Sequence, residues 1–158
     1  MTGTLGRIEA CVPALRRYAA SLLRDRQEVD DLVHDCLVRA LDRLHTRQQN
    51  AEMRPWLFAI LRNLYVNRIR QIKVRGSTDS LDVVPDSALM VSPRQEEQVA
   101  TQDIMRAVER LPEGLRSVLL LVTVEDLSYE EVAQVLNIPI GTVMSRLSRA
   151  RERIRQQS

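Results

Sequence analysis

The segment from Leu127 to Arg155 constrains the fold of this chain more than any other, because it predicts two helices joined by a short turn. Ser128 and Glu131 have the spacing of a capping box, in which a hydroxyl and a carboxylate bond the free backbone N–H groups at a helix start. We expect this helix to end just before Asn137, since asparagine tolerates the left-handed backbone that ends a helix. Pro139 suits the first turn of the next helix, where the N–H that proline lacks would have no partner.

The second helix of this segment combines an apolar stripe with a basic outward face. Its apolar residues recur at helical spacing: Val143, Leu147, Ala150 and Ile154. This spacing leaves hydrogen-bond donors on the outward faces: Thr142, Ser145, Arg146, Arg149 and Arg153. A basic helix by itself is commonly just a solvated surface, but a preceding helix and tight turn are typical of helices that enter the DNA major groove. We therefore expect these donors to contact base edges and phosphates.

Composition indicates a soluble globular protein, with 44% hydrophobic and 28% charged residues in a chain of 158. The longest apolar run, around 118–122, is too short to cross a bilayer, and the N-terminus has no signal-peptide pattern. We expect a cytoplasmic location, where Cys11 and Cys36 are buried thiols and do not form a disulfide. His34 and Cys36 lie two residues apart in a helix and point to opposite sides, so we expect no metal site. Nothing in the pattern predicts a cofactor.

The net charge of +2 hides a segregation of charge along the chain. Residues 1–76 carry 14 basic and 8 acidic side chains, and residues 77–112 carry 3 basic and 7 acidic ones. The last 18 residues, from Gly141, carry 5 basic and 1 acidic side chain. Two basic surfaces separated by an acidic connector suit two contacts with a polyanion.

The periodicity predicts an all-α fold. One apolar face runs through Ile8, Val12, Leu15, Ala19, Leu22 and Leu23. A second runs through Val29, Leu32, Val33, Cys36, Leu37, Ala40, Leu41 and Leu44, and we expect the two helices to pack together. After a polar break at 46–52, Pro55 opens a third helix with a basic end at 68–75.

The sequence also predicts two small helical domains, 1–75 and 92–158, joined by a flexible linker at 76–91. The linker is rich in Ser, Asp and Pro and has few large apolar residues. Ser92 and Gln95 have the spacing of another capping box, at the start of a helix that leads to Arg110. Pro112 opens the helix before the helix-turn-helix.

Three motifs in order make the chain similar to bacterial sigma-70 family sigma factors of the extracytoplasmic-function (ECF) group. "DDLVHDCLVRAL" from Asp30 resembles the family's helix that docks on the polymerase clamp, and "RPWLFAILRNLYVNRIR" from Arg54 resembles the helix that reads the minus-10 element. "LPEGLRSVLLL" from Leu111 and "LSYEEVAQVLNIPIGTVMSRLSRAR" from Leu127 resemble the domain that reads the minus-35 element. The resemblance implies region 2-like and region 4-like domains, promoter-specific initiation in a stress response, and three partners: core RNA polymerase, promoter DNA and an anti-sigma factor.

The resemblance and the helical pattern together predict the remaining site residues. Those expected to bind polymerase lie off the apolar stripe of the second helix: Asp31, His34, Asp35 and Val38. Those expected to bind the minus-10 element lie on the third helix: Trp56, Arg62, Asn63, Asn67, Arg68 and Arg70. Trp56 and Phe58 suit either base stacking or core packing. By resemblance, the loop 46–52 captures a flipped base. Met144 departs from the Lys or Arg common in relatives, and this puts one DNA contact in doubt.

Two other classes of protein share parts of this pattern. A stand-alone helix-turn-helix regulator would use residues up to 75 for dimerisation or sensing, but this leaves the polymerase-binding resemblance of that half unexplained. A sigma mimic that sequesters an inhibitor needs no basic recognition helix, whereas this chain has one. An enzyme is disfavoured, because the sequence has neither a phosphate-cradling glycine loop nor a cluster of His, Cys and carboxylates at ligand spacing.

Overall fold

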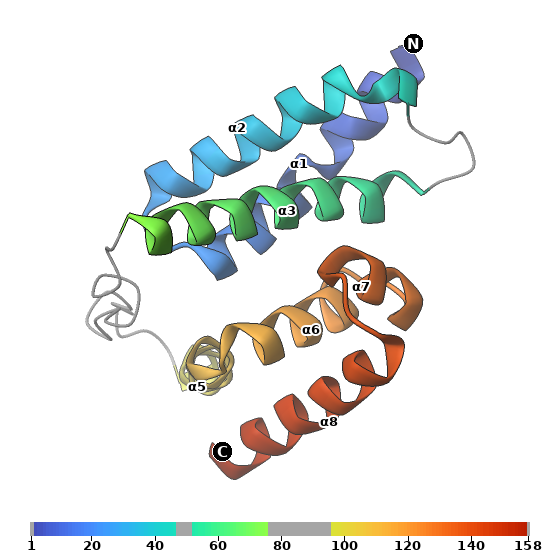
Figure 1. Ribbon diagram of the computed structural model, residues 1–158. Coiled ribbons are helices and arrows are strands. Elements are labelled where there is room, and N and C mark those ends of the chain that lie inside the picture. The colour runs from blue at the N-terminus through green and yellow to red at the C-terminus, as the bar shows by residue number, and fades with distance from the viewer. Residues whose placement is uncertain (1, 47–51, 76–95, 158) are drawn as a thin grey trace.

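The computed structural model describes residues 2–46, 52–75 and 96–157, which form α-helices, one short 3-10 helix and no strand (Figure 1). The elements are α1 (Thr2–Leu22), α2 (Arg26–Asp42), the 3-10 helix η1 (Leu44–Thr46), α3 (Met53–Val74), α5 (Glu96–Arg110), α6 (Glu113–Thr123), α7 (Tyr129–Leu136) and α8 (Ile140–Gln157). The all-α prediction is confirmed. No helix in these ranges is both long enough and apolar enough to span a membrane.

The N-terminal group of helices, α1 to α3, packs as the apolar periodicity predicted. Leu15, Leu32, Cys36 and Leu57 are fully buried where the three helices meet. Asp25 caps α2 by accepting a hydrogen bond from the backbone N–H of Gln27. Helix α3 begins at Met53, two residues before the predicted start at Pro55, so Pro55 lies within its first turn.

The predicted apolar face of α2 is wrong at one position, Leu41. Its side chain is 48% exposed, since it lies at the edge of the buried stripe, close to the exposed Val38. Both cysteines are buried, free thiols as expected. Burial raises the pKa of Cys36 to about 12, so this thiol is chemically inert at neutral pH.

The predicted helix-turn-helix is confirmed in α7 and α8. The hydroxyl of Ser128 accepts from the backbone N–H of Glu131 at 3.1 Å, and the Glu131 carboxylate accepts from the backbone N–H of Ser128 at 2.8 Å. Asn137 adopts the left-handed conformation with φ 56° and ψ 51°. Pro139 precedes the first residue of α8 and accepts from the backbone N–H of Val143 at 3.2 Å. The turn is therefore fixed by local sequence.

Helix α6 begins after Pro112, as predicted, and ends at Thr123. Asp126, in the connection to α7, has a φ of 60° that the sequence did not signal. The predicted capping box at Ser92 and the linker 76–91 lie outside the described residues.

The two groups of helices pack against each other, and we call this contact the seam. Figure 1 shows α1–α3 as one group and α5–α8 as the other, with α3 facing α6 and α7. Helix α3 contacts α7 and helix α1 contacts α6, so one cluster of buried apolar side chains runs through both groups. The division into separately folding domains at 1–75 and 92–158 stays a prediction, because contact across the seam does not decide whether each part folds alone.

Candidate nucleic-acid interface

The predicted recognition helix, α8, has the expected buried stripe and presents several of its predicted DNA-binding residues to solvent. Val143, Leu147 and Ala150 are buried against α6 and α7. Of the outward residues, three are exposed: Ser145, Arg149 and Arg153. Ser145 donates its hydroxyl to the backbone carbonyl of Thr142 at 3.2 Å. The exposed set forms a polar and basic strip along the second helix of the helix-turn-helix.

Two predicted DNA-binding residues of α8 are only half-buried, and so less available than expected. Thr142 lies in the first turn of the helix. The guanidinium of Arg146 lies over Gly114 of α6, where a Cβ would stand 3.2 Å from its Nη1 atom. Arg146 therefore lies against α6, and only glycine at position 114 leaves that space open.

Helix α3 carries its predicted minus-10 residues on different faces. Asn63, Asn67 and Arg70 are exposed, and helical spacing puts them on one side. They line a cleft of about 510 Å³ between α2, α3 and the end of α7, together with Arg39 of α2 and Arg43, the residue that follows α2. The cleft is thus basic and amide-rich, a surface chemistry that suits a polyanion.

The aromatic residues at the start of α3 separate into two environments. Phe58 is 1% exposed and makes an edge-to-face contact with Tyr18, with ring centroids 5.7 Å apart, so it belongs to the core. Trp56 is half-buried and packs against the core with part of its surface open. The loop 46–52, apart from Thr46 and Glu52 at its ends, lies outside the described residues.

Arg62 lies in the seam and does not face the cleft freely. Its Nη1 and Nη2 atoms donate to the Glu113 carboxylate at 2.6 and 2.9 Å, in a two-pronged ion pair. The Nη1 atom also lies 3.2 Å from the Tyr18 hydroxyl. Burial alone would lower the pKa of Arg62, but the bonds to Glu113 and Tyr18 raise it overall, so the guanidinium keeps its charge. In this arrangement both Nη atoms of Arg62, which also lines the cleft, are bonded to Glu113.

Arg68 of α3 and Asp35 of α2, one predicted to bind DNA and the other polymerase, are joined by an ion pair with a 3.0 Å Nη2–Oδ2 distance. Asp31, His34 and Val38 lie on the exposed face of α2, and the Val38 side chain is 46% exposed. Leu41 is exposed as well, so the face of α2 that carries these polar residues also presents two apolar side chains to solvent.

The residues that join the two groups of helices were not found from sequence. Tyr18 donates to the Ser117 hydroxyl at 3.0 Å, and Ser117 donates to Glu113 at 2.5 Å. Farther along the seam, Glu125 accepts from Arg17 at 2.9 and 3.1 Å and from Arg54 at 3.0 Å. Their only sequence signal was polar residues next to apolar stripes, a pattern that ordinary surfaces also show.

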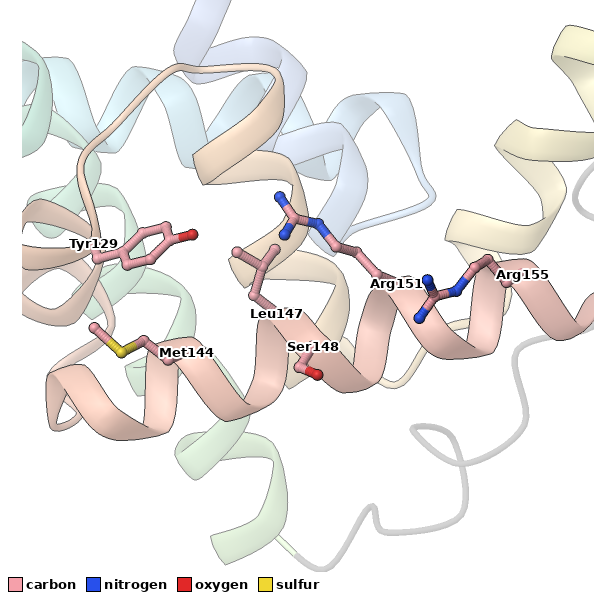
Figure 2. Close-up of a pocket in the computed structure, with 6 residues that line it drawn as sticks. All are labelled: Tyr129, Met144, Leu147, Ser148, Arg151 and Arg155. Atoms are coloured by element: carbon pink, nitrogen blue, oxygen red, sulfur yellow. The ribbon is translucent and has the colours of Figure 1, made fainter.

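A second face of α8 holds a small hollow of about 280 Å³ beside the start of α7. Figure 2 shows the ring of Tyr129 and the thioether of Met144 at one end of it, and the guanidinium groups of Arg151 and Arg155 toward the other. Arg155 also pairs with Glu152 at 2.6 Å. The sequence predicted no role for these arginines beyond their contribution to the basic C-terminal end.

Each group of helices matches a protein family described as part of a sigma factor. The family described as "Sigma-70, region 4" matches residues 101–154, and the family described as "Sigma2 domain of PhyR" matches residues 8–62. The ECF RNA polymerase sigma factor EcfG of Rhodopseudomonas palustris (strain TIE-1) is 35% identical over 147 residues, which are 93% of this chain and 80% of that protein. The ECF sigma factor SigW of Bacillus subtilis (strain 168) is 28% identical over 151 residues, which are 86% of this chain and 78% of that protein.

The solved structures include a closely similar fold. The sigma factor RpoE of Bartonella quintana, solved in complex with the anti-sigma factor NepR, superposes with a TM-score of 0.82 at 30% identity. The match covers 99% of this chain and 97% of that one. The helix-turn-helix with its exposed arginines, the basic cleft along α3 and a sigma factor relative that matches almost the whole chain lead to one conclusion. The chain belongs to the extracytoplasmic-function group of RNA polymerase sigma factors, which direct core polymerase to promoters.

Proposed function

We propose that this sigma factor reads the minus-35 element with α8 and the minus-10 element with α3. The observation that carries the first part is the exposure of Ser145, Arg149 and Arg153 along the second helix of a capped helix-turn-helix. A helix in this position can enter the major groove, where guanidinium groups pair with guanine edges and hydroxyls bond bases or phosphates. Thr142 is half-buried in the first turn of α8, and Arg146 would join the exposed residues once its side chain turns away from α6.

The minus-10 role rests on the basic cleft along α3. Asn63, Asn67 and Arg70 offer amide and guanidinium donors on one face, and the half-buried Trp56 adds an aromatic side chain at the start of the same helix. Arg62 and Arg68 are engaged in ion pairs with Glu113 and Asp35, so we propose that they reach DNA only after those pairs open.

The polymerase-binding role belongs to the exposed face of α2. Asp31, His34 and Asp35 are polar, and Val38 adds an apolar contact at the centre of the face. A surface that joins carboxylates to an exposed apolar side chain fits a basic partner with a matching pocket. We assign this face to core polymerase by the resemblance of the "DDLVHDCLVRAL" helix.

An anti-sigma factor is the third proposed partner. The solved relative with a TM-score of 0.82 is held by the anti-sigma factor NepR, and this chain adopts a similar arrangement of helices. We propose a cytoplasmic protein that acts by binding and has no cofactor or reaction of its own, since its relatives are initiation factors.

The test is transcription with purified core polymerase on genomic DNA fragments, with mapping of transcript starts. We expect transcripts that need this chain and begin downstream of a shared pair of elements. Tight, sequence-specific duplex binding by the chain alone, with no transcript when polymerase is added, would favour the stand-alone regulator. Capture of an anti-sigma factor without any transcript would favour the sigma mimic.

A further inference from the structure

The seam between the two groups of helices carries two ion clusters built on the same plan. In the first, Arg62 meets Glu113, and the two side chains are 13% and 29% exposed. In the second, Arg17 and Arg54 meet Glu125, whose side chain is 2% exposed. Both carboxylates come from the C-terminal group, and all three guanidinium groups come from the N-terminal group. Glu113 and Glu125 are thus each paired with guanidinium groups from the other side of the seam.

The first cluster is a connected hydrogen-bonded set. Both Nη atoms of Arg62 meet Glu113, while Tyr18 donates to Ser117 and Ser117 donates to Glu113. The residues come from α3, α6 and α1, so the set holds three helices together. Moving α6 away from α1 and α3 would break the bonds of Arg62 to Glu113 and of Tyr18 to Ser117 together, and only the Ser117–Glu113 bond, within α6, would remain.

Glu113 occupies the guanidinium fork in the way that a DNA phosphate would. A carboxylate and a phosphate both present two oxygen acceptors to the parallel N–H groups of arginine. Arg62 also neighbours Asn63 and shares the basic cleft with Asn67 and Arg70. A strand of DNA that runs along this cleft would therefore meet an arginine whose fork is already filled.

We propose that Glu113 and Glu125 form a latch that holds the free sigma factor closed, and that Glu113 competes with promoter DNA for Arg62. This inference rests on the proposed minus-10 role of α3 and names how that surface is regulated. Opening the seam releases Arg62 and separates α3 from α7 in one step. DNA binding and opening are then thermodynamically coupled, so each favours the other.

Buried charge pairs suit a reversible latch, because the cost of removing both ions from water offsets much of their attraction. When the seam opens, Glu113 and Glu125 regain water and Arg62 regains access to phosphate. The apparent affinity of the free protein for DNA is lowered in proportion to the fraction of molecules that are open. Neutralising the latch raises that fraction.

The experiment compares the full-length chain with E113Q, and with E130Q as a matched control that removes the same charge at an exposed site on α7. Two measurements are made without polymerase: the radius of gyration by X-ray scattering, and the affinity for a fluorescent single-stranded DNA of mixed sequence. A closed chain of this length has a radius of about 15 Å. We expect E113Q to expand by several ångström and to bind the oligonucleotide about tenfold more tightly. E130Q should match the wild type in both.

Three further arms make the outcome decisive. E125Q tests the second cluster, and R17Q tests it from the exposed side of the seam in case the buried substitution unfolds the protein. The double substitution E113R with R62E restores an ion pair with its charges reversed. It should close the chain again, and its DNA affinity should not rise to that of E113Q. Equal radii and equal DNA affinities for wild type, E113Q and E130Q would overturn the latch. Transcription with core polymerase separates a failure of the latch from a failure of the proposed function. If the wild type is active with core polymerase but E113Q matches it in radius and DNA affinity, the latch alone is rejected. If the wild type is inactive, the proposed function is rejected.

Discussion

Among single residues, Arg149 offers a direct test of the minus-35 assignment, because its side chain is exposed on α8. Arg149→Ala removes a base-reading or phosphate-binding guanidinium, worth about 1 to 3 kcal/mol if it reads a base. We expect at least about fivefold less run-off transcript from a promoter that needs its minus-35 element, with unchanged polymerase affinity. Arg106→Ala on α5 is the control, and equal losses from both substitutions would reject the specific role of Arg149.

Glu113 makes the closed arrangement sensitive to acid. Burial raises its pKa, but the bonds from Arg62 and Ser117 outweigh burial, so the pKa lies below the ordinary 4.5. The other charged or titratable groups that face it are Arg116, Tyr18 and Tyr65, and none of these loses its neutral-pH form in mild acid.

A carboxylate with a lowered pKa stabilises the closed state fully above its ordinary pKa, and that contribution disappears as pH falls through the lowered value. We therefore expect the radius of gyration to increase as the pH falls below about 4.5, while the chain keeps its helical circular dichroism. In E113Q the acid-dependent step should shrink. An identical step in the wild type and E113Q would assign it to other carboxylates.

At the scale of elements, the capping box of α7 offers a quantitative stability test. Ser128→Ala leaves the backbone N–H of Glu131 without its side-chain acceptor, so the free energy of unfolding should fall by about 1 kcal/mol. Asn137→Gly should be tolerated, because glycine adopts the left-handed conformation at φ 56° without strain. Urea unfolding monitored by circular dichroism measures both. A larger loss from the glycine variant would mean that the Asn137 side chain, not its backbone conformation, matters.

The helix-turn-helix was predictable because its signals are local. The cap at Ser128, the left-handed Asn137 and the stripe from Val143 to Ile154 each depend on residues within a few positions of one another. The seam was not predictable. Ser117 is buried beside Tyr18, 99 positions away, to which its hydroxyl is bonded, and Glu125 is buried beside two arginines from the other group.

The candidate site shows the same division. Helical spacing found the exposed side chains of α8 and the amide-rich face of α3. It also placed Arg62 and Arg146 among the outward residues, although tertiary contacts turn both toward α6. A long, flexible arginine can lie against a neighbouring helix that the helical period cannot foresee. The predicted outward faces of α3 and α8 therefore carry the exposed side chains, but the predicted outward directions of Arg62 and Arg146 are wrong.

For the whole molecule, the tether between the two groups should matter as much as either group. We expect a fragment of residues 1–75 to keep most of the polymerase affinity, because the proposed docking face lies on α2. A mixture of fragments 1–75 and 92–158 at micromolar concentration should not restore minus-35-directed transcription, since the covalent connection supplies a far higher effective concentration. Run-off transcription with the intact chain as control measures this. Full activity from the unlinked mixture would show that contacts across the seam alone can assemble the factor.

The close approach of Arg146 to Gly114 couples inherited variation in α6 to the choice of genes that are switched on. An alanine at this position would put a methyl group 3.2 Å from the Nη1 atom of Arg146, so the guanidinium, the flexible end of its side chain, would have to move. A lineage that acquires this alanine would shift its promoter repertoire through a change on α6. Drift at a position outside the recognition helix would then rewire a regulon while every arginine of that helix stays in place.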